Sequence, residues 1–191
     1  MRAPLFAFIL IVAGCGEDQA QLPANGAAPG EQGAPAAAGR IDRKRAGAMA
    51  PGAAFLDPDG EPAYFADFRG KPLLVNLWAT WCAPCITEMP TLDALAEREQ
   101  GLQVLAISQD IDGKEKVDAF FAERRFSALE PYLDPDLELM GAIGIASLPT
   151  TILYDGEGRE VWRLMGIEDW TGPRAAALID EASKASPAKA R

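Results

Sequence analysis

Apolar residues form continuous runs and helically spaced sets, and the two kinds alternate through the middle of the chain. Residues 73–79 and 102–108 are nearly continuously apolar, as expected for strands that are covered on both faces of a sheet. Between them, residues 84–100 have the spacing of an amphipathic helix, and Gly101 is placed to end it. The apolar positions of this helix are Ile86, Met89, Leu92 and Leu95.

Shorter elements are predicted on either side of this unit. Ala54–Leu56 and Ala63–Phe65 surround the turn residues 57–60, which indicates a hairpin of two short strands. After the second buried run, Asp112–Glu115 matches a capping box and predicts the start of a helix. The apolar residues that this helix should bury are Val117, Phe120 and Phe121.

The C-terminal third predicts four further elements. A short helix covers residues 137–143, and strands at 150–154 and 160–165 are joined by a Gly-rich hairpin turn at 155–158. A last helix covers residues 173–183. The resulting order, β-β-β-α-β-α-α-β-β-α, predicts an α/β fold with a mixed sheet and helices on both faces.

The N-terminus has the features of an export signal. Arg2 precedes an apolar run over residues 3–13, which as a helix would rise about 16 Å, too little to span a hydrocarbon core of about 30 Å. Val12-Ala13-Gly14-Cys15 resembles a bacterial lipobox, so we expect a signal peptide at 1–14 and a lipidated Cys15 as the first mature residue. An unrelated apolar start with a chance cysteine is the alternative.

Residues 15–52 are rich in Ala, Gly, Pro and Gln and lack a periodic apolar face, so we expect a disordered tether. The folded domain is then expected at 53–185, followed by a disordered tail at 186–191. The tether contains a basic cluster that we interpret as a solvated charge run rather than a lipid contact. Its members are Arg40, Arg43, Lys44 and Arg45.

Charge and cysteine usage exclude several classes of site. The net charge of −10 argues against nucleic acid as a partner, so no nucleic-acid binding is expected. The chain has three cysteines and no histidine, and structural zinc strongly prefers Cys and His ligands. We therefore expect no metal and no cofactor. With Cys15 lipidated, the remaining two cysteines form one CxxC in an oxidising compartment.

The CxxC, Cys82-Ala83-Pro84-Cys85, lies where a buried strand meets a helix. A cysteine at a helix N-terminus has its thiolate favoured by free N–H groups and by the macrodipole, and the thiolate is the nucleophile in disulfide exchange. Cys82 is thus the expected attacking cysteine and Cys85 the resolving one. A structural bridge is the alternative, but a bridge that closes so short a loop stabilises little.

Residues 74–85, Leu-Val-Asn-Leu-Trp-Ala-Thr-Trp-Cys-Ala-Pro-Cys, resemble the active-site strand and helix start of the thioredoxin superfamily. Within it, the chain is similar to the TlpA/ResA-type membrane-anchored oxidoreductases. Shared features are the N-terminal hairpin, Gly70-Lys71-Pro72, Met89-Pro90, an inserted segment around 126–145 and Pro149-Thr150-Thr151. The resemblance implies a thioredoxin-like fold with an N-terminal β-hairpin and a central insertion.

The resemblance also implies roles for single residues. Asn76 stands where thioredoxin has a buried proton-accepting aspartate, and the TlpA/ResA branch places a functional glutamate at the position of Glu88. A solvated helix glutamate is the alternative. Leu148-Pro149 is expected to have a cis bond against the CxxC and to present the Leu148 backbone to substrate. Trp81 would form an apolar lip for docking, with plain packing as the alternative, and Trp78 would lie in the core.

We therefore expect a monomeric, lipid-anchored protein on the periplasmic side of the bacterial membrane, acting on exported proteins with disulfides or thiols. Because no histidine stabilises the Cys82 thiolate, a reductant near the thioredoxin potential of about −270 mV is favoured over an oxidant near −120 mV. Its electrons would come from a membrane thiol transporter. The rival hypotheses are a Cu(I)-binding module using the thiols with Met89, and a thiol-dependent peroxidase.

Overall fold

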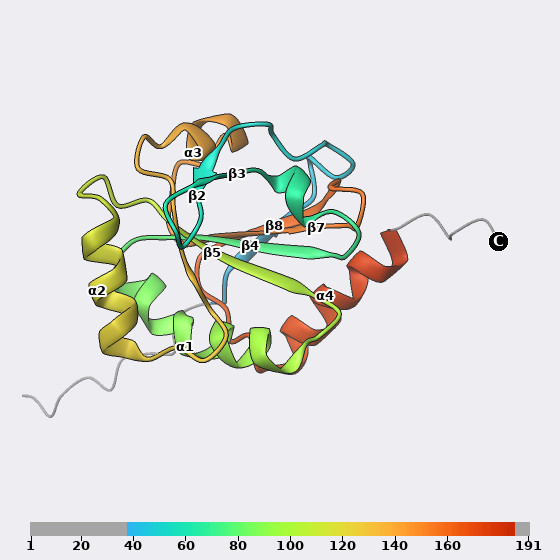
Figure 1. Ribbon diagram of the computed structural model, residues 1–191. Coiled ribbons are helices and arrows are strands. Elements are labelled where there is room, and N and C mark those ends of the chain that lie inside the picture. The colour runs from blue at the N-terminus through green and yellow to red at the C-terminus, as the bar shows by residue number, and fades with distance from the viewer. Residues whose placement is uncertain (1–37, 186–191) are drawn as a thin grey trace, which may run out of the picture. The chain divides into compact units, whose positions relative to one another are not determined.

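The computed structural model describes residues 38–185 (Figure 1). The predicted signal peptide, the lipidation site Cys15, the tether up to residue 37 and the tail at 186–191 lie outside the described residues. They stay predictions.

The domain is built on one mixed eight-stranded sheet with the order β1-β8-β7-β4-β5-β6-β2-β3. β4, β5 and β6 run parallel, whereas β7, β8 and β1 continue from β4 in antiparallel pairs. The strands are β1 (Arg40–Asp42), β2 (Phe55–Leu56), β3 (Pro62–Ala63), β4 (Leu73–Trp78), β5 (Gln103–Ser108), β6 (Pro131–Leu133), β7 (Thr150–Tyr154) and β8 (Glu160–Met165). The helices are the 3₁₀ turn η1 (Phe65–Phe68), α1 (Ala83–Arg98), α2 (Lys114–Arg124), α3 (Glu138–Ile143) and α4 (Pro173–Ala185).

Two hydrophobic cores lie on opposite faces of the sheet. α1, α2 and α4 bury their apolar residues against one face, and α3, η1 and the β2–β3 hairpin cover the other (Figure 1). β4 serves both cores: Leu74 and Trp78 point into the first, and Leu73, Val75 and Leu77 into the second. A strand buried on both faces reads as a continuous apolar run, so the prediction for residues 73–79 is confirmed.

The expected disorder through residue 52 is wrong from residue 38 onward. β1 pairs with the edge of β8, and the Gly39 N–H donates a hydrogen bond to the Ile167 carbonyl at 2.7 Å. β1 has one apolar residue, Ile41, so its ordering comes from ladder hydrogen bonds that the hydrophobic pattern does not reveal.

All four members of the basic cluster are exposed, as expected for a solvated charge run, and two of them also have specific partners. The Arg43 guanidinium binds both carboxylate oxygens of Glu181, at 2.7 and 3.0 Å. Arg45 donates to the Ile143 carbonyl at 2.8 Å. These contacts fix the segment before β2 against α4 and the end of α3.

Three smaller predictions differ from the structure. β6 was not predicted, and residues 65–68 form η1 instead of extending the second hairpin strand. The capping box is absent, because Gly113 is the N-cap of α2 with a φ of 95° and makes no side-chain cap bond. Asp112 instead accepts a hydrogen bond from Lys116 at 2.7 Å.

Candidate redox site

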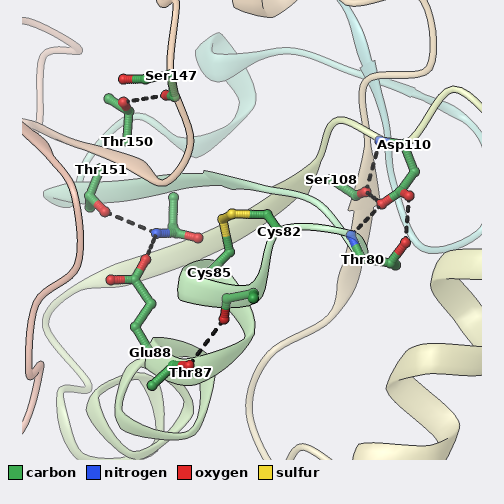
Figure 2. The surroundings of a disulfide bond; sticks show 12 residues. Thr80, Cys82, Cys85, Thr87, Glu88, Ser108, Asp110, Ser147, Thr150 and Thr151 are labelled. Atoms are coloured by element: carbon green, nitrogen blue, oxygen red, sulfur yellow. Dashed lines mark hydrogen bonds between the residues drawn. A yellow bond between two sulfur atoms is a disulfide. The ribbon is translucent and has the colours of Figure 1, made fainter. Parts of the chain in front are cut away.

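The CxxC lies at the junction of β4 and α1, and its two cysteines form a disulfide bond with their Cα atoms 5.3 Å apart (Figure 2). Cys82 is the N-cap of α1, with Pro84 in the first turn. The first turn contains no acidic residue, so no carboxylate there opposes a thiolate at the helix N-terminus.

Both cysteines are largely buried, but 6% of the Cys82 surface is exposed and none of the Cys85 surface. Cys82 lines a surface groove with a volume of about 380 Å³, while Cys85 is fully buried in the core under α1. Disulfide exchange requires direct contact between the attacking sulfur and the substrate. The geometry therefore agrees with the order expected from the sequence, in which Cys82 meets the substrate and Cys85 acts within the protein.

The groove beside Cys82 has mostly apolar walls. Trp81 is 66% exposed, which excludes plain packing as its role, whereas Trp78 is fully buried as predicted. Leu148 lines the same groove, and its bond to Pro149 is cis. The remaining lining residues are Gln109, Leu137, Met140, Ala146 and Ser147. Trp81 and Leu148, which lie far apart in the sequence, thus line the same groove as Cys82, and Pro149 follows Leu148 through the cis bond.

Glu88 lies one turn beyond Cys85 and is buried, with 3% of its surface exposed, so the alternative of a solvated helix glutamate is wrong. Its Oε1 accepts a hydrogen bond from Asn76 Nδ2 at 2.7 Å, and its Oε2 accepts one from the Glu168 N–H at 3.0 Å. Burial raises the pKa of Glu88 to about 7, although these two hydrogen bonds oppose the rise. A carboxyl with this pKa can take up and release a proton near neutral pH.

Asn76 connects Glu88 to the sheet. Its Nδ2 also donates to Thr151 Oγ1 at 2.9 Å, so the dashed lines from Glu88 and Thr151 meet at one amide (Figure 2). Its Oδ1 is buried without a hydrogen-bond partner in residues 38–185. The residue that replaces thioredoxin's aspartate therefore does not titrate but orients the carboxyl that does.

A second buried carboxylate, Asp110, holds the loop before the CxxC (Figure 2). It accepts hydrogen bonds from the Thr80 N–H at 2.8 Å, from the Thr80 hydroxyl at 2.5 Å and from the Ser108 hydroxyl at 2.7 Å, and Lys116 lies 3.2 Å away. Burial opposes ionisation of Asp110, but these partners outweigh it and lower its pKa. The ionised carboxylate fixes Thr80 two residues before Cys82.

Sequence reasoning singled out the cysteines, Glu88, Trp81 and Leu148 but gave no site role to the other groove residues, among them Gln109, or to Asp110 and Thr151. A signal for two of them was available. Gln109 and Asp110 directly follow β5, which is parallel to β4, so their positions at the same edge of the sheet as the CxxC could have been inferred.

Two further findings concern the described part of the chain. Within residues 38–185, no helix is long and apolar enough to cross a membrane. The same residues contain no cluster of three or more His, Cys, Asp or Glu side chains suited to a metal ion. Met89, the extra ligand considered for Cu(I), is fully buried in the core.

Known proteins are similar to this chain in sequence. The family model described as Redoxin matches residues 45–179. The thiol-disulfide oxidoreductase ResA of Geobacillus thermodenitrificans is 34% identical over 116 residues, which cover 59% of this chain and 65% of the relative. The thiol:disulfide interchange protein HelX of Rhodobacter capsulatus is 37% identical over 124 residues, which cover 63% of this chain and 68% of the relative.

The fold has solved counterparts as well. The exposed lipoprotein thioredoxin Etrx1 of Streptococcus pneumoniae superposes with a TM-score of 0.60 at 22% identity, covering 68% of this chain and 98% of that one. This similarity concerns the fold alone. Because the family model matches well over half of the chain, the protein belongs to the Redoxin family, as a thioredoxin-like oxidoreductase of the TlpA/ResA type.

Proposed function

We propose that this protein is an extracytoplasmic thiol–disulfide oxidoreductase that reduces disulfides in exported proteins. One observation carries the proposal: in a CxxC disulfide at a helix N-terminus, Cys82 lines a groove and Cys85 is buried one turn from Glu88. A structural bridge has no need of a groove or of a buried carboxyl that titrates near neutral pH. The names of ResA and HelX describe the same chemistry.

The reaction is a pair of thiol–disulfide exchanges. In the reduced protein, the Cys82 thiolate attacks one sulfur of the substrate disulfide, so that a mixed disulfide forms and the other substrate sulfur leaves as a thiolate. Cys85 then attacks the Cys82 sulfur and releases the second substrate thiolate. Two electrons pass from the protein to the substrate, and the Cys82–Cys85 disulfide remains.

Glu88 provides the base for the second exchange. Cys85 has to lose its proton before it can attack, and an isolated thiolate in a buried site is costly. With its pKa at about 7, Glu88 is half ionised near neutral pH and can accept that proton. Asn76 and the Glu168 N–H hold its two oxygens in place.

The location and the direction follow from the sequence. The lipobox at 12–15 supports export and attachment to the membrane by lipid, and the periplasmic side supplies disulfide-bonded partners. A reductase there needs electrons from the cytoplasm, for which a membrane thiol transporter is the donor. Without a histidine to stabilise the Cys82 thiolate, we expect a midpoint potential nearer about −270 than −120 mV, to be measured in glutathione buffers.

The test is the reduction of a disulfide-bonded peptide by the dithiothreitol-reduced, desalted protein in a single turnover. The parent should release two peptide thiols per protein. Cys82→Ser should be inactive because the nucleophile is lost, and Cys85→Ser should stop at a mixed disulfide visible by mass spectrometry. Release of both thiols by Cys82→Ser, or no reaction by the parent, would show that the proposal is wrong.

A further inference from the structure

Gln109 is a buried polar residue in the wall of the groove that holds Cys82. It directly follows β5, and its N–H donates to the Trp78 carbonyl at 2.8 Å. Only 3% of its surface is exposed. A polar side chain buried to this degree is normally fully hydrogen-bonded.

The Gln109 amide is satisfied at one end only. Its Nε2 lies 3.3 Å from the carbonyl oxygens of both Ile107 and Ser108 and donates to them. Its Oε1 is buried and has no hydrogen-bond partner among the residues that the structure describes. The reverse orientation of the amide would place Oε1 against those two carbonyl oxygens, so the assignment of the amide atoms is fixed by chemistry.

The position of Gln109 follows from the alternation of β5. Leu105 and Ile107 face the core on the α3 side of the sheet, and Gln109 continues this series beyond the end of the strand. Leu137 and Met140, from the start of α3, line the same groove, as do Trp81 and Leu148. Gln109 thus belongs to the wall of a groove whose large side chains are apolar, while its unused acceptor Oε1 is itself closed to solvent.

We propose that Gln109 is a substrate-positioning residue. Its amide, held only by two 3.3 Å hydrogen bonds, turns toward the groove when substrate binds, and its Oε1 then accepts a hydrogen bond from a backbone N–H of the polypeptide that carries the disulfide under attack. The inference rests on the proposed function and deepens it by naming the substrate class: polypeptide disulfides in preference to small disulfides without an amide. The N–H belongs to a residue within two positions of the attacked cysteine.

The chemistry of the groove selects this donor. An unpaired buried acceptor requires an N–H or O–H partner, and a charged donor would have to lose its hydration beside apolar walls. A backbone N–H is neutral, and every cysteine within a polypeptide carries one of its own. One hydrogen bond to it would orient the disulfide toward Cys82 without selecting a particular side chain.

The test compares the parent with Gln109→Met, which keeps a similar volume and removes the acceptor. The substrates are a disulfide-bonded peptide and the small disulfide 4,4′-dithiodipyridine, which has neither an N–H nor an O–H. Gln109→Met should lower kcat/KM for the peptide about 10-fold, mainly through KM, and change the rate with the small disulfide by less than two-fold. The midpoint potential should not change.

Gln103→Met is the matched control, because Gln103 lies on the same strand at its opposite end and donates to the Phe68 carbonyl at 2.6 Å. It should leave both rates unchanged. A series of peptides, each N-methylated at one position near the cysteine, then identifies the donor. For one of these peptides, N-methylation should lower the kcat/KM of the parent about 10-fold. The same methylation should cause no further decrease in Gln109→Met.

Equal losses on both substrates, or no loss on the peptide, would overturn the assignment of Gln109. The assignment would also be overturned if, at every peptide position, the decreases in kcat/KM caused by N-methylation and by Gln109→Met added together. A failure of the proposed function gives a different result, since the parent itself would then reduce neither the peptide nor the small disulfide.

Discussion

At the scale of single residues, two features that one buried aspartate combines in thioredoxin are divided between two residues here. These features are the place in the strand before the CxxC and a carboxyl that titrates. Asn76 occupies the position in β4, and Glu88 supplies the titrating carboxyl from α1, one turn beyond Cys85. The amide of Asn76 joins them by donating both to Glu88 and to Thr151. The proposed proton acceptor therefore lies on the same helix as the cysteine that it would serve.

Glu88→Gln should slow the release of reduced product about 10- to 100-fold while the first attack by Cys82 stays within a few-fold, because only the second step needs this base. In the parent, the resolution rate should rise with pH through about 7 as Glu88 ionises. In the variant this rise should be absent. Stopped-flow reduction of a model disulfide from pH 5 to 9 measures both.

Glu97→Gln is the control for this experiment, since Glu97 is an exposed carboxylate on the same helix. Identical pH profiles for parent and Glu88→Gln would mean that another base acts. Glutamine does not reproduce every contact, because both Glu88 oxygens accept N–H groups and one of them would be replaced by an NH₂ group. The comparison therefore depends on the shape of the pH profile rather than on the absolute rate.

Burial of Glu88 also predicts the pH dependence of stability. Its pKa is about 7 in the folded protein and 4.5 ordinarily, so between these values the folded chain holds a proton that the unfolded chain has lost. The free energy of unfolding should therefore fall as pH rises across this window. Relative to Glu88→Gln, the oxidised parent should lose about 2 kcal/mol between pH 5 and 8 in urea titrations. A constant difference between the two proteins would contradict the raised pKa.

At the scale of elements, the hydrophobic pattern was sufficient to locate the longer strands and the helix α1, which bury several of their own side chains. β4, β5, β7, β8 and α1 lie within a few residues of their predicted bounds. β1 and β6 were missed because each is a three-residue strand, too short to show a hydrophobic pattern, although Ile41, Tyr132 and Leu133 pack into the cores. Their positions are set by pairing with β8 and β5. Local sequence contains little information about such pairing.

The same limit applies to the site. The CxxC and Glu88 could be found because their spacing along one helix fixes their geometry. Gln109, Asp110 and Thr151 reach the site from β5 and β7, so their roles depend on the register between strands. Parallel pairing of β4 with β5, in which Trp78 lies opposite Ser108, places the residues after both strands at one edge.

Asp110 joins three of these elements, the end of β5, the start of α2 and the loop before α1, and its replacement should loosen all three. In Asp110→Asn, the NH₂ group cannot accept the hydrogen bonds that one carboxylate oxygen accepts. We expect a loss of about 2 kcal/mol of unfolding free energy and faster amide exchange at Thr80, whose N–H Asp110 binds. Urea titration and hydrogen exchange provide the two measurements.

Asp118→Asn is the control for this change, because Asp118 forms a partly exposed pair with Lys114 on α2. Such pairs contribute less than about 1 kcal/mol. If Asp110→Asn behaves like this control, the loop before the CxxC does not depend on the carboxylate.

At the scale of the whole molecule, the described domain begins earlier than the sequence pattern indicates. The chain joins the sheet at Arg40, and Arg174 donates to the Gly39 carbonyl at 2.6 Å, so α4 helps to hold the start of the domain. The proposed tether is then shortened to residues 15–37. With about 23 residues, a flexible chain has a root-mean-square reach of about 27 Å. That still allows the groove to meet partners at a membrane surface.

Anchoring through Cys15 is the prediction that connects this domain to a membrane. Cys15→Ser should abolish labelling by radioactive palmitate in a bacterial host and leave the protein uncleaved or released without acyl chains, because the thiol that carries the lipid is gone. The variant keeps Cys82 and Cys85, so its reduction of a peptide disulfide in solution should equal that of the parent domain. Its fractionation with membranes should be lost or should depend on the uncleaved signal. Labelling that survives Cys15→Ser would mean that the cysteine is not the anchor, and the protein would then have to reach its partners without the lipid tether.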